Sequence, residues 1–534
     1  MKIITMVIVC HKTQVTTEFT RVTFISDLVV GHIVQHNWLS DNMISTKVIA
    51  VVLAVIVVAG GVTAVVVYNN NNNKNDYGDT DLQLASADIK PVLEVYGNVN
   101  EDLTIDAKDI EVLNKAITDG KTADYRYADA NHDGTVNADD ATYIQSIIDA
   151  TPASPVNIYH LNRANTGDYY AWSKAPVDAV VGTGAGNMFT MYKYLGIESA
   201  GSGPLKGIAY YSKIDASLYA EYQSFFNSTY RVGNSAGFFN IEKVTDMITL
   251  QGVQAIFTAD SMANYLCGSN DSYPNCYTEQ GAIEAGLGVY RFAPAATDMS
   301  SYLSDLAMMS FVLGRSNDVV TVLEVWCETF FTDLNEKLEN HIGKDTKQVR
   351  AVASSMATYT KKSDGTIDTY NYVSSPTSDY TDVIKAAGAY FALGDYDFKG
   401  STTSAKMTDL GEWLASYKID KIVNIRTGSG YSWYAGDVLK DNTAKGKVSS
   451  VMQAFEKSEP YYNNQVYVIS GDMAVPLRIA YAAHVLYPEI FSAEWAQNYN
   501  ISHSIIIGIS AENVKNGTFA VSMSDVGLSG GSTA

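Results

Sequence analysis

Oxygen-bearing side chains recur at alternate positions in the stretch DANHDGTVNADD, which begins at Asp129. A hard cation such as Ca²⁺ takes six to eight oxygen ligands, and a 12-residue loop supplies them from positions 1, 3, 5, 7, 9 and 12. Position 7 contributes its backbone carbonyl. The residues at these six positions are Asp129, Asn131, Asp133, Thr135, Asn137 and Asp140. An acidic, solvated loop is the alternative interpretation, and the pattern favours a calcium site.

A second copy of the loop lies upstream, in GNVNEDLTIDAKD. Its six ligand positions hold Asn98, Asn100, Asp102, Thr104, Asp106 and Asp109. Position 8 is apolar in both copies, Ile105 and Val136, and an apolar helix pattern follows each loop. Position 6, where the loop turns sharply, is Gly134 in the second copy and Leu103 in the first. We therefore predict two Ca²⁺ sites in a small helical unit, with weaker binding or a partly structural role in the first.

This pair of loops resembles a dockerin domain, because each loop ends in Asp and is followed by a single helix. The resemblance implies a cohesin-type module as a partner. In that family loop positions 10 and 11 contact the partner, and here they are Ala107, Lys108, Ala138 and Asp139. The two pairs differ, which argues against two interchangeable binding modes.

Composition restricts the possible classes of function. The chain has 534 residues, of which 46% are hydrophobic and 18% charged, so most of it can bury a core. The net charge of -21 argues against nucleic acid as a partner. Cys267 and Cys276 flank a polar loop, and we predict a disulfide between them outside the cytoplasm.

Residues Val48 to Tyr68 contain no charge and would span about 30 Å as a helix, which is enough to cross a bilayer. Lys47 precedes this run and an acidic stretch follows it, so we expect the bulk of the chain outside a cell membrane. A cleaved signal peptide is the alternative, but its apolar core is shorter. Met43 is a candidate for the true start of the chain.

The predicted organisation has nine segments. They are an N-terminal segment (1–47), a transmembrane anchor (48–68), an Asn-rich linker (69–85), a dockerin-like domain (86–150), a linker (151–155), a first lobe (156–299), an interlobe helix (300–345), a second lobe (346–492) and a C-terminal extension (493–534).

The large C-terminal region alternates strand-like and helix-like patterns, which predicts an α/β fold. Strand candidates begin at Asp178, Gly207, Val253 and Gly288 in the first lobe, and at Val349, Asp420 and Gln465 in the second. Between them an apolar helix period runs from Asp298, with a break at GRSN. The sequence contains no H-E-x-x-H or P-loop motif, and we predict a protein that is not an enzyme.

Four phrases in order resemble the class III substrate-binding proteins of ABC importers: PVDAVVGTGAGNMFTMYKYLGI, DLAMMSFVLGR, EWLASYKIDKIVNI and AFEKSEPYYNNQVYVISGD. The resemblance implies two Rossmann-like lobes joined by a long helix. It also implies an iron complex, corrinoid or haem as ligand, and an ABC permease and ATPase as partners. In that family one acidic residue on each lobe docks on the permease, and the matching positions are Asp246 and Glu412.

Loops at the strand ends of such a fold supply the ligand contacts. The candidates are Thr183, Gly184, Asn187, Thr258, Asp260, Arg291, Arg426, Tyr431, Trp433 and Tyr434. An arginine beside aromatic rings suits an anionic or large planar ligand. The function that we predict is a membrane-anchored extracytoplasmic solute-binding protein with a Ca²⁺-binding dockerin module. The alternative is a dockerin-bearing polysaccharide-active enzyme or a cell-surface scaffold or adhesion protein.

Overall fold

The computed structural model describes residues 80–164, 167–210, 214–234, 237–260, 266, 268–398, 404–406, 416–428, 431, 433–434 and 438–531. The predicted anchor, Met43 and Cys267 lie outside these residues, as does Glu412. Within the part of the chain that is described, no helix combines the length and the apolar character needed to cross a membrane. The anchor at Val48 to Tyr68 therefore stays a prediction.

The small N-terminal module contains the two loops and the helices that follow them: α3 (Ala107–Asp119), η1 (Thr122–Asp124) and α4 (Ala138–Ile148). α3 and α4 each begin with a capping box, in which Asp106 or Asn137 accepts a bond from the helix backbone. The helices pack around a compact core of Val99, Leu113, Ala128, Ala130 and Ile144. Asp106 and Asn137, at position 9 of each loop, thus start the two helices.

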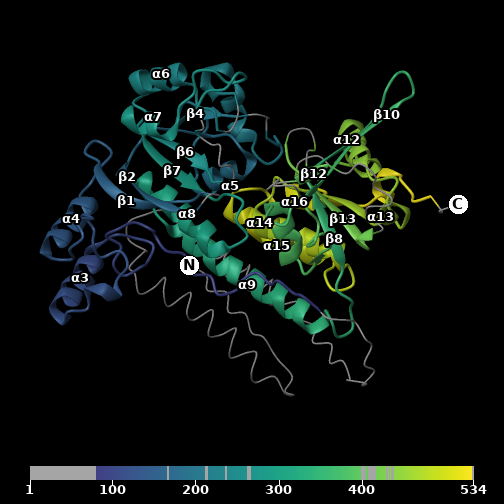
Figure 1. Cartoon of the computed structure of the whole chain (residues 1–534), viewed down its shortest axis with the longest axis horizontal. Helices are drawn as coiled ribbons and strands as arrows, with labels where there is room; N and C mark the ends of the chain where they lie inside the picture. Colours follow the sequence, from purple (N-terminus) through teal and green to yellow (C-terminus); the bar gives the residue numbers. More distant parts are fainter. Residues whose placement is uncertain are drawn as a thin grey trace, which may run out of the picture. The chain divides into compact units, whose positions relative to one another are not determined.

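A two-stranded antiparallel hairpin follows, made of β1 (Val156–Asn162) and β2 (Tyr169–Ala175), with Val156 opposite Ala175. The hairpin lies between the small module and the first lobe (Figure 1). No strand was predicted from the sequence in this stretch.

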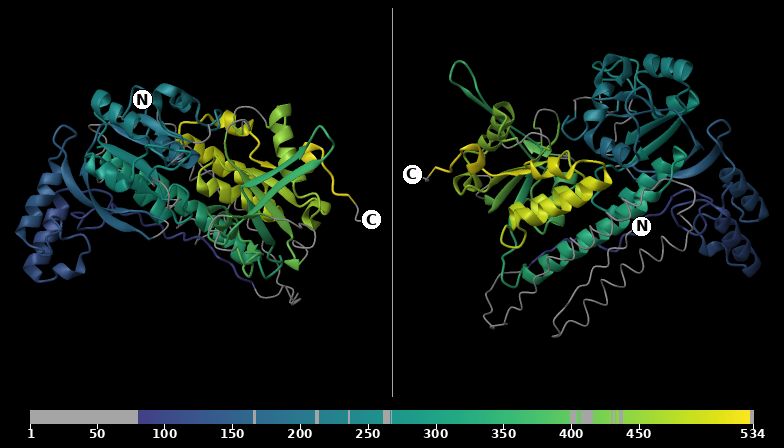
Figure 2. Two further views of the ribbon diagram at one scale, coloured as in Figure 1. Left: turned by 45° about the horizontal axis from the view of Figure 1, so that its top comes forward. Right: turned by 180° about the vertical axis from the view of Figure 1, so that it is seen from behind.

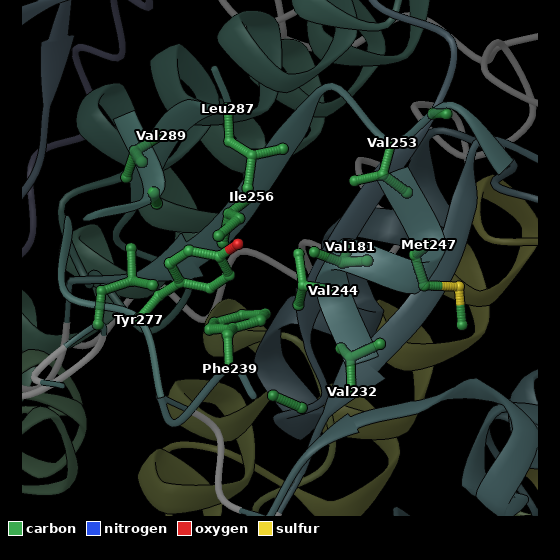
Figure 3. Packing of buried hydrophobic residues seen from close by; sticks show 14 residues of the cluster. Val181, Val232, Phe239, Val244, Met247, Val253, Ile256, Tyr277, Leu287 and Val289 are labelled. Atoms are coloured by element: carbon green, nitrogen blue, oxygen red, sulfur yellow. The ribbon is translucent and has the colours of Figure 1, made fainter. Parts of the chain in front are cut away.

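The first lobe is built on a parallel five-stranded sheet in the order β5-β4-β3-β6-β7. Its strands are β3 (Val180–Thr183), β4 (Leu205–Ala209), β5 (Arg231–Gly233), β6 (Ala255–Ala259) and β7 (Gly288–Phe292). Its helices are α5 (Gly186–Tyr194), η2 (Ala220–Phe226), η3 (Ser228–Tyr230), α6 (Ile241–Gln251) and α7 (Glu279–Glu284). Figure 3 shows the cluster in which Phe239 and Val244 pack against Val181, Val232 and Ile256 of the sheet.

Two helices connect the lobes, α8 (Met299–Val312) and α9 (Asp318–His341). α9 has 24 residues and is about 36 Å long. The break between them falls on the predicted GRSN segment, where Gly314 adopts a φ of 60°. Cys327 is buried on α9.

The second lobe contains a five-stranded sheet in the order β11-β8-β13-β14-β15, in which only the β14–β15 pair is antiparallel. These strands are β8 (Arg350–Ser354), β11 (Tyr390–Phe391), β13 (Lys421–Arg426), β14 (Val466–Ser470) and β15 (Ala520–Val521). A separate antiparallel sheet contains β9 (Met356–Lys361), β10 (Ile367–Ser374) and β12 (Ser404–Lys406). The helices are α10 (Asp379–Ala386), α12 (Asn442–Gln453), α13 (Glu459–Tyr462), α14 (Val475–Leu486), α15 (Ala493–Ile506), α16 (Ala511–Lys515) and η4 (Ser524–Val526).

The α/β fold class is confirmed, because both lobes contain parallel sheets with the seven predicted strands in place. The segment predicted as a C-terminal extension supplies α15, α16 and the edge strand β15 of the second lobe. Figure 2 shows these yellow elements packed within the second lobe.

Candidate functional site

The second loop is held in shape by its own carboxylates. Asp129 accepts backbone N–H bonds from Asp133 at 3.1 Å and Gly134 at 2.9 Å. Asp140 is fully buried and accepts from the backbone N–H groups of Asn131 at 3.2 Å and Asn137 at 2.8 Å. Gly134 has a φ of 90°, the left-handed conformation that a side chain disfavours. The shape of the loop is therefore fixed by hydrogen bonds from its own backbone to Asp129 and Asp140.

At its last position, the first loop makes the same two backbone hydrogen bonds as the second loop. Asp109 accepts from the backbone N–H groups of Asn100 at 3.1 Å and Asp106 at 2.8 Å. Burial raises the pKa of Asp109 to about 6, although these two hydrogen bonds lower it. A bound cation would offset that burial by favouring the ionised carboxylate.

Position 1 is one of the positions at which the loops differ. Asn98 replaces the aspartate, and its side-chain amide donates to the carbonyls of Leu93 at 2.8 Å and Asp102 at 2.7 Å. Its Oδ1 is buried and has no hydrogen-bond partner in the described residues. An unpartnered buried oxygen at the first ligand position fits a site that a cation completes.

Both loops offer amide and carbonyl oxygens besides carboxylates, which is the donor set that Ca²⁺ prefers. Among the described residues, no three His, Cys, Asp or Glu side chains gather into a metal cluster. A Ca²⁺ ion bound in these loops would also be held by the Asn side chains and by the carbonyls of Thr104 and Thr135. All four residues predicted to contact a cohesin-type partner are exposed: Ala107, Lys108, Ala138 and Asp139.

In the first lobe, two predicted ligand residues meet at the point where the strand order reverses. Thr183 ends β3 and Thr258 lies on neighbouring β6, and their buried hydroxyls are 3.2 Å apart. The backbone of Gly184 passes so close to Tyr210 that an added Cβ would lie 2.9 Å from that residue's Cβ. Ligands of open α/β sheets bind outside the carboxyl ends of the strands at such reversal points.

In the second lobe, Arg426 ends β13 at the corresponding reversal point, between β8 and β13. Its guanidinium donates to the carbonyl of Ser355 and, at 3.3 Å, to the hydroxyl of Tyr431. The ring of Tyr431 stacks on that of Trp433 with centroids 5.2 Å apart. The indole Nε1 of Trp433 is buried and has no partner in the described part of the chain.

The loops of the two lobes bond directly to each other. The backbone N–H of Trp433 donates to Asp215 Oδ2 at 3.2 Å, and that of Tyr434 donates to Ser217 Oγ at 3.1 Å. The hydroxyl of Tyr219 donates to the backbone carbonyl of Asp472 at 3.1 Å. We call this contact between the strand-end loops of the two lobes the lobe interface.

Buried charges gather at the lobe interface. Arg478 of α14 is 2% exposed, and its guanidinium donates to Asn187 Oδ1 of the first lobe. Asp472 accepts the backbone N–H of Gly428 with both oxygens at 3.1 Å. Burial, and secondarily the charge of Asp215, raise the pKa of Asp472 to about 8. Burial, followed by Asp379 of the second lobe, raises the pKa of Asp260 to about 7.

Arg291 was predicted to contact the ligand, but its guanidinium is bound within the first lobe. It donates to Glu279 at 2.6 Å and to the hydroxyl of Tyr169 at 3.1 Å. Asp246 is exposed on α6. A residue that docks on a permease has to be exposed, and this role of Asp246 stays a prediction. Cys276 is buried, and the predicted disulfide cannot be followed because Cys267 lies outside the described residues.

Sequence reasoning missed the buried charged residues Asp215, Asp472 and Arg478 and the half-buried Asp379. A signal was present for Arg478, which is the single Lys, Arg, Asp or Glu in the apolar helix VPLRIAYAAHVL. Asp472 follows β14 by two residues, at a strand end where ligand contacts are expected.

Comparison with known proteins agrees with the first resemblance. Residues 96–148 match the family model of the dockerin type I domain, which confirms the dockerin prediction. Dockerins are Ca²⁺-binding modules. No curated protein sequence matches the chain.

Solved structures similar to this chain include periplasmic binding proteins. The TroA-like protein FepB from Veillonella parvula has 14% identity and a TM-score of 0.42, covering 68% of this chain and 99% of its own. The petrobactin-binding protein YclQ from Bacillus subtilis has 15% identity and a TM-score of 0.34, covering 67% and 98%. The heme-binding protein BhuT, in complex with two hemes, has 15% identity and a TM-score of 0.36, covering 59% and 99%.

Proposed function

We propose that this chain is a membrane-anchored, extracytoplasmic solute-binding protein that delivers an iron complex, corrinoid or haem to an ABC permease. The observation that carries the proposal is the lobe interface. Two parallel-sheet lobes, joined by α8 and α9, bring their strand-end loops together at Asp215, Trp433 and Asp472. A ligand held between such lobes is contacted from both sides.

The chemistry of the lobe interface favours a large ligand with aromatic or planar parts. The stacked rings of Tyr431 and Trp433 are buried at the lobe interface, and the indole N–H of Trp433, which has no partner among the described residues, is a hydrogen-bond donor. Arg426 lies against the same ring pair through its bond to Tyr431. Arginine beside aromatic rings binds carboxylates and planar π-systems, which corrinoids, haem and many iron chelators carry.

The dockerin module adds a second role, attachment to a cohesin-type partner. This role is supported by the exposure of the four predicted contact residues, which leaves the starts of α3 and α4 accessible. We propose that Ca²⁺ fills both loops, since their last carboxylates accept the same two backbone bonds.

A thermal-shift screen tests the solute-binding function. The panel contains cobalamin, cobinamide, haem, ferric siderophores and oligosaccharides. A ligand at about 100 times its Kd stabilises the protein by about 2.7 kcal/mol, a readable shift in Tm. A shift with a metal complex would support the proposal, whereas a shift or cleavage with oligosaccharides alone would replace it with the polysaccharide-active alternative.

A matched pair of variants then localises the ligand. Trp433→Phe keeps the stacked ring and removes the unpartnered N–H, so it should weaken the ligand-induced shift. Trp495→Phe serves as the control, because it removes an indole hydrogen bond to Asp333 away from the lobe interface. Equal ligand shifts in both variants would place the ligand elsewhere.

A further inference from the structure

A segment of residues 80–95, here called the strap, runs beside the interlobe helices and connects both lobes to the dockerin module (Figure 2). At its start, Asp81 exchanges two hydrogen bonds of 2.9 Å with the side chain of Gln348, directly before the second lobe. Farther along, the carbonyl of Ala85 accepts from Asn335 of α9 at 2.8 Å. The strap then reaches α8, where Ser304 accepts the backbone N–H of Val92 at 2.8 Å.

The strap ends in the first calcium loop. Leu93 is fully buried, and its backbone N–H donates to the carbonyl of Asp102 at 2.9 Å. Its carbonyl accepts from the side chain of Asn98 at 2.8 Å. Asn98 and Asp102 are positions 1 and 5 of the loop, so two ligand positions hold the strap next to its contact with α8.

The same loop also holds the start of α9. Asn317 is the N-cap residue of α9, yet it makes no side-chain bond to its own helix. Instead, its side-chain amide donates to the carbonyl of Leu103 at loop position 6. Asn at an N-cap ordinarily accepts a backbone N–H of the helix. Asn317 therefore connects the break between α8 and α9 to the calcium loop.

The second loop contacts the first lobe through an aromatic stack. His132 at loop position 4 adopts a φ of 53°, and its ring lies 3.8 Å from that of Tyr159 on β1, nearly parallel. Behind Tyr159, the neighbouring His160 stacks on Tyr290 of β7. Figure 1 shows α3 and α4 beside the β1–β2 hairpin, consistent with these contacts.

We propose that the dockerin module is a calcium-dependent brace for the interlobe hinge, in which Ca²⁺ in the first loop fixes the start of α9 through Asn317 and the strap through Asn98. The brace rests on the calcium binding proposed above and adds a regulatory role for the ion. Loss of Ca²⁺ loosens the loop, and the break between α8 and α9 then opens more often. Extracellular Ca²⁺ thereby sets the rigidity of the ligand-binding lobes.

Hydrogen exchange of the whole chain, with Ca²⁺ added or chelated, tests the brace. Where local opening requires release of the ion, exchange slows by a factor of one plus the ratio of free Ca²⁺ to Kd, about a hundredfold at 100 times Kd. We expect such slowing in residues 98–109 and also at the start of α9. Slowing confined to the loops would overturn the brace while leaving calcium binding intact. No slowing in the loops would overturn both, and the ligand screen would remain independent of that result.

The variant Asn317→Asp distinguishes a coupling between the first calcium loop and α9 from simple capping of α9. Asp is as good an N-cap as Asn, so a purely structural role at the start of α9 predicts no loss of protection there. The brace predicts the opposite, because a carboxylate cannot donate to the carbonyl of Leu103. We expect Ca²⁺ to keep protecting the loops in this variant and to lose its effect on α9. Full retention of the effect on α9 would contradict the assigned role of Asn317.

Discussion

The buried carboxyl of Asp472 predicts that the stability of the lobes falls as the pH rises above neutrality. Burial raises its pKa to about 8 in the folded protein, far above the value of about 3.9 expected in the unfolded chain. A group with a raised folded-state pKa stabilises the fold at low pH and loses that contribution as the pH rises through the folded pKa. The loss for Asp472 therefore extends from about pH 4 to about pH 8.

Each proton held only by the folded state changes the free energy of unfolding by about 1.4 kcal/mol per pH unit. Between pH 6.5 and pH 8, Asp472 therefore accounts for a loss of about 2 kcal/mol. Asp260 and Asp305, whose pKa values burial raises to about 7, add to the same trend. The buried His160 and His503 have lowered pKa values, about 4 and about 3, and act in the opposite sense mainly below pH 6.5.

Asp472→Asn isolates this contribution, because an amide has the shape of a neutral carboxyl and cannot ionise. We expect the variant to be more stable than the wild type at pH 8, and to lose about 2 kcal/mol less between pH 6.5 and pH 8. Urea unfolding followed by tryptophan fluorescence at the two pH values measures the difference. Asp364→Asn, at an exposed site where Thr366 lowers the pKa, is the control and should leave the slope unchanged. Identical slopes for Asp472→Asn and the wild type would refute the reasoning.

The remaining predictions concern the calcium loops, the core and the anchor. Chelation with EDTA should lower the Tm of the whole chain. Asp140→Ala should reproduce much of that fall, and Asp139→Ala, at an exposed position, should not. A Tm that changes neither with EDTA nor with Asp140→Ala would contradict Ca²⁺ binding in the loops. Phe239→Ala should cost about 3 to 5 kcal/mol because it empties a fully buried core site, whereas Leu250→Ser, at a position 79% exposed, should change stability by less than about 0.5 kcal/mol in urea unfolding. Deletion of residues 48–68 should move the chain from the membrane fraction to the soluble one, and a full-length chain already found in the soluble fraction would exclude the anchor.

Local patterns in the sequence carried the predictions that succeeded. The ligand spacing of the calcium loops is contained within 12 residues, so no distant contact is needed to recognise it. The buried strands are short apolar runs between turn residues, which is why β3, β6 and β13 were found. The helix break was predicted because Gly, Ser and Asn interrupt the apolar period after Val312.

Long-range pairing explains what the sequence did not reveal. Strand β15 has two residues and forms through antiparallel pairing with the edge of β14, with Val468 opposite Val521. The hairpin at Val156–Ala175 is rich in polar and aromatic residues, so its pattern carries little strand signal until it packs on the small module. The charges at the lobe interface come from segments far apart in the chain, and no local spacing relates Asp215 to Trp433.

The contacts of the dockerin module divide its surface into two parts, one that packs on the chain's own lobes and one that stays exposed. The loops face the chain's own lobes, through Leu103 to Asn317 and through His132 to Tyr159. The first turns of its helices stay exposed, at Ala107, Lys108, Ala138 and Asp139. A module that served only as a tether for an external partner would need neither the aromatic stack nor the bond that draws Asn317 away from its own helix. Because the two faces do not overlap, a partner bound to the helix starts and a brace on the hinge are compatible in one molecule.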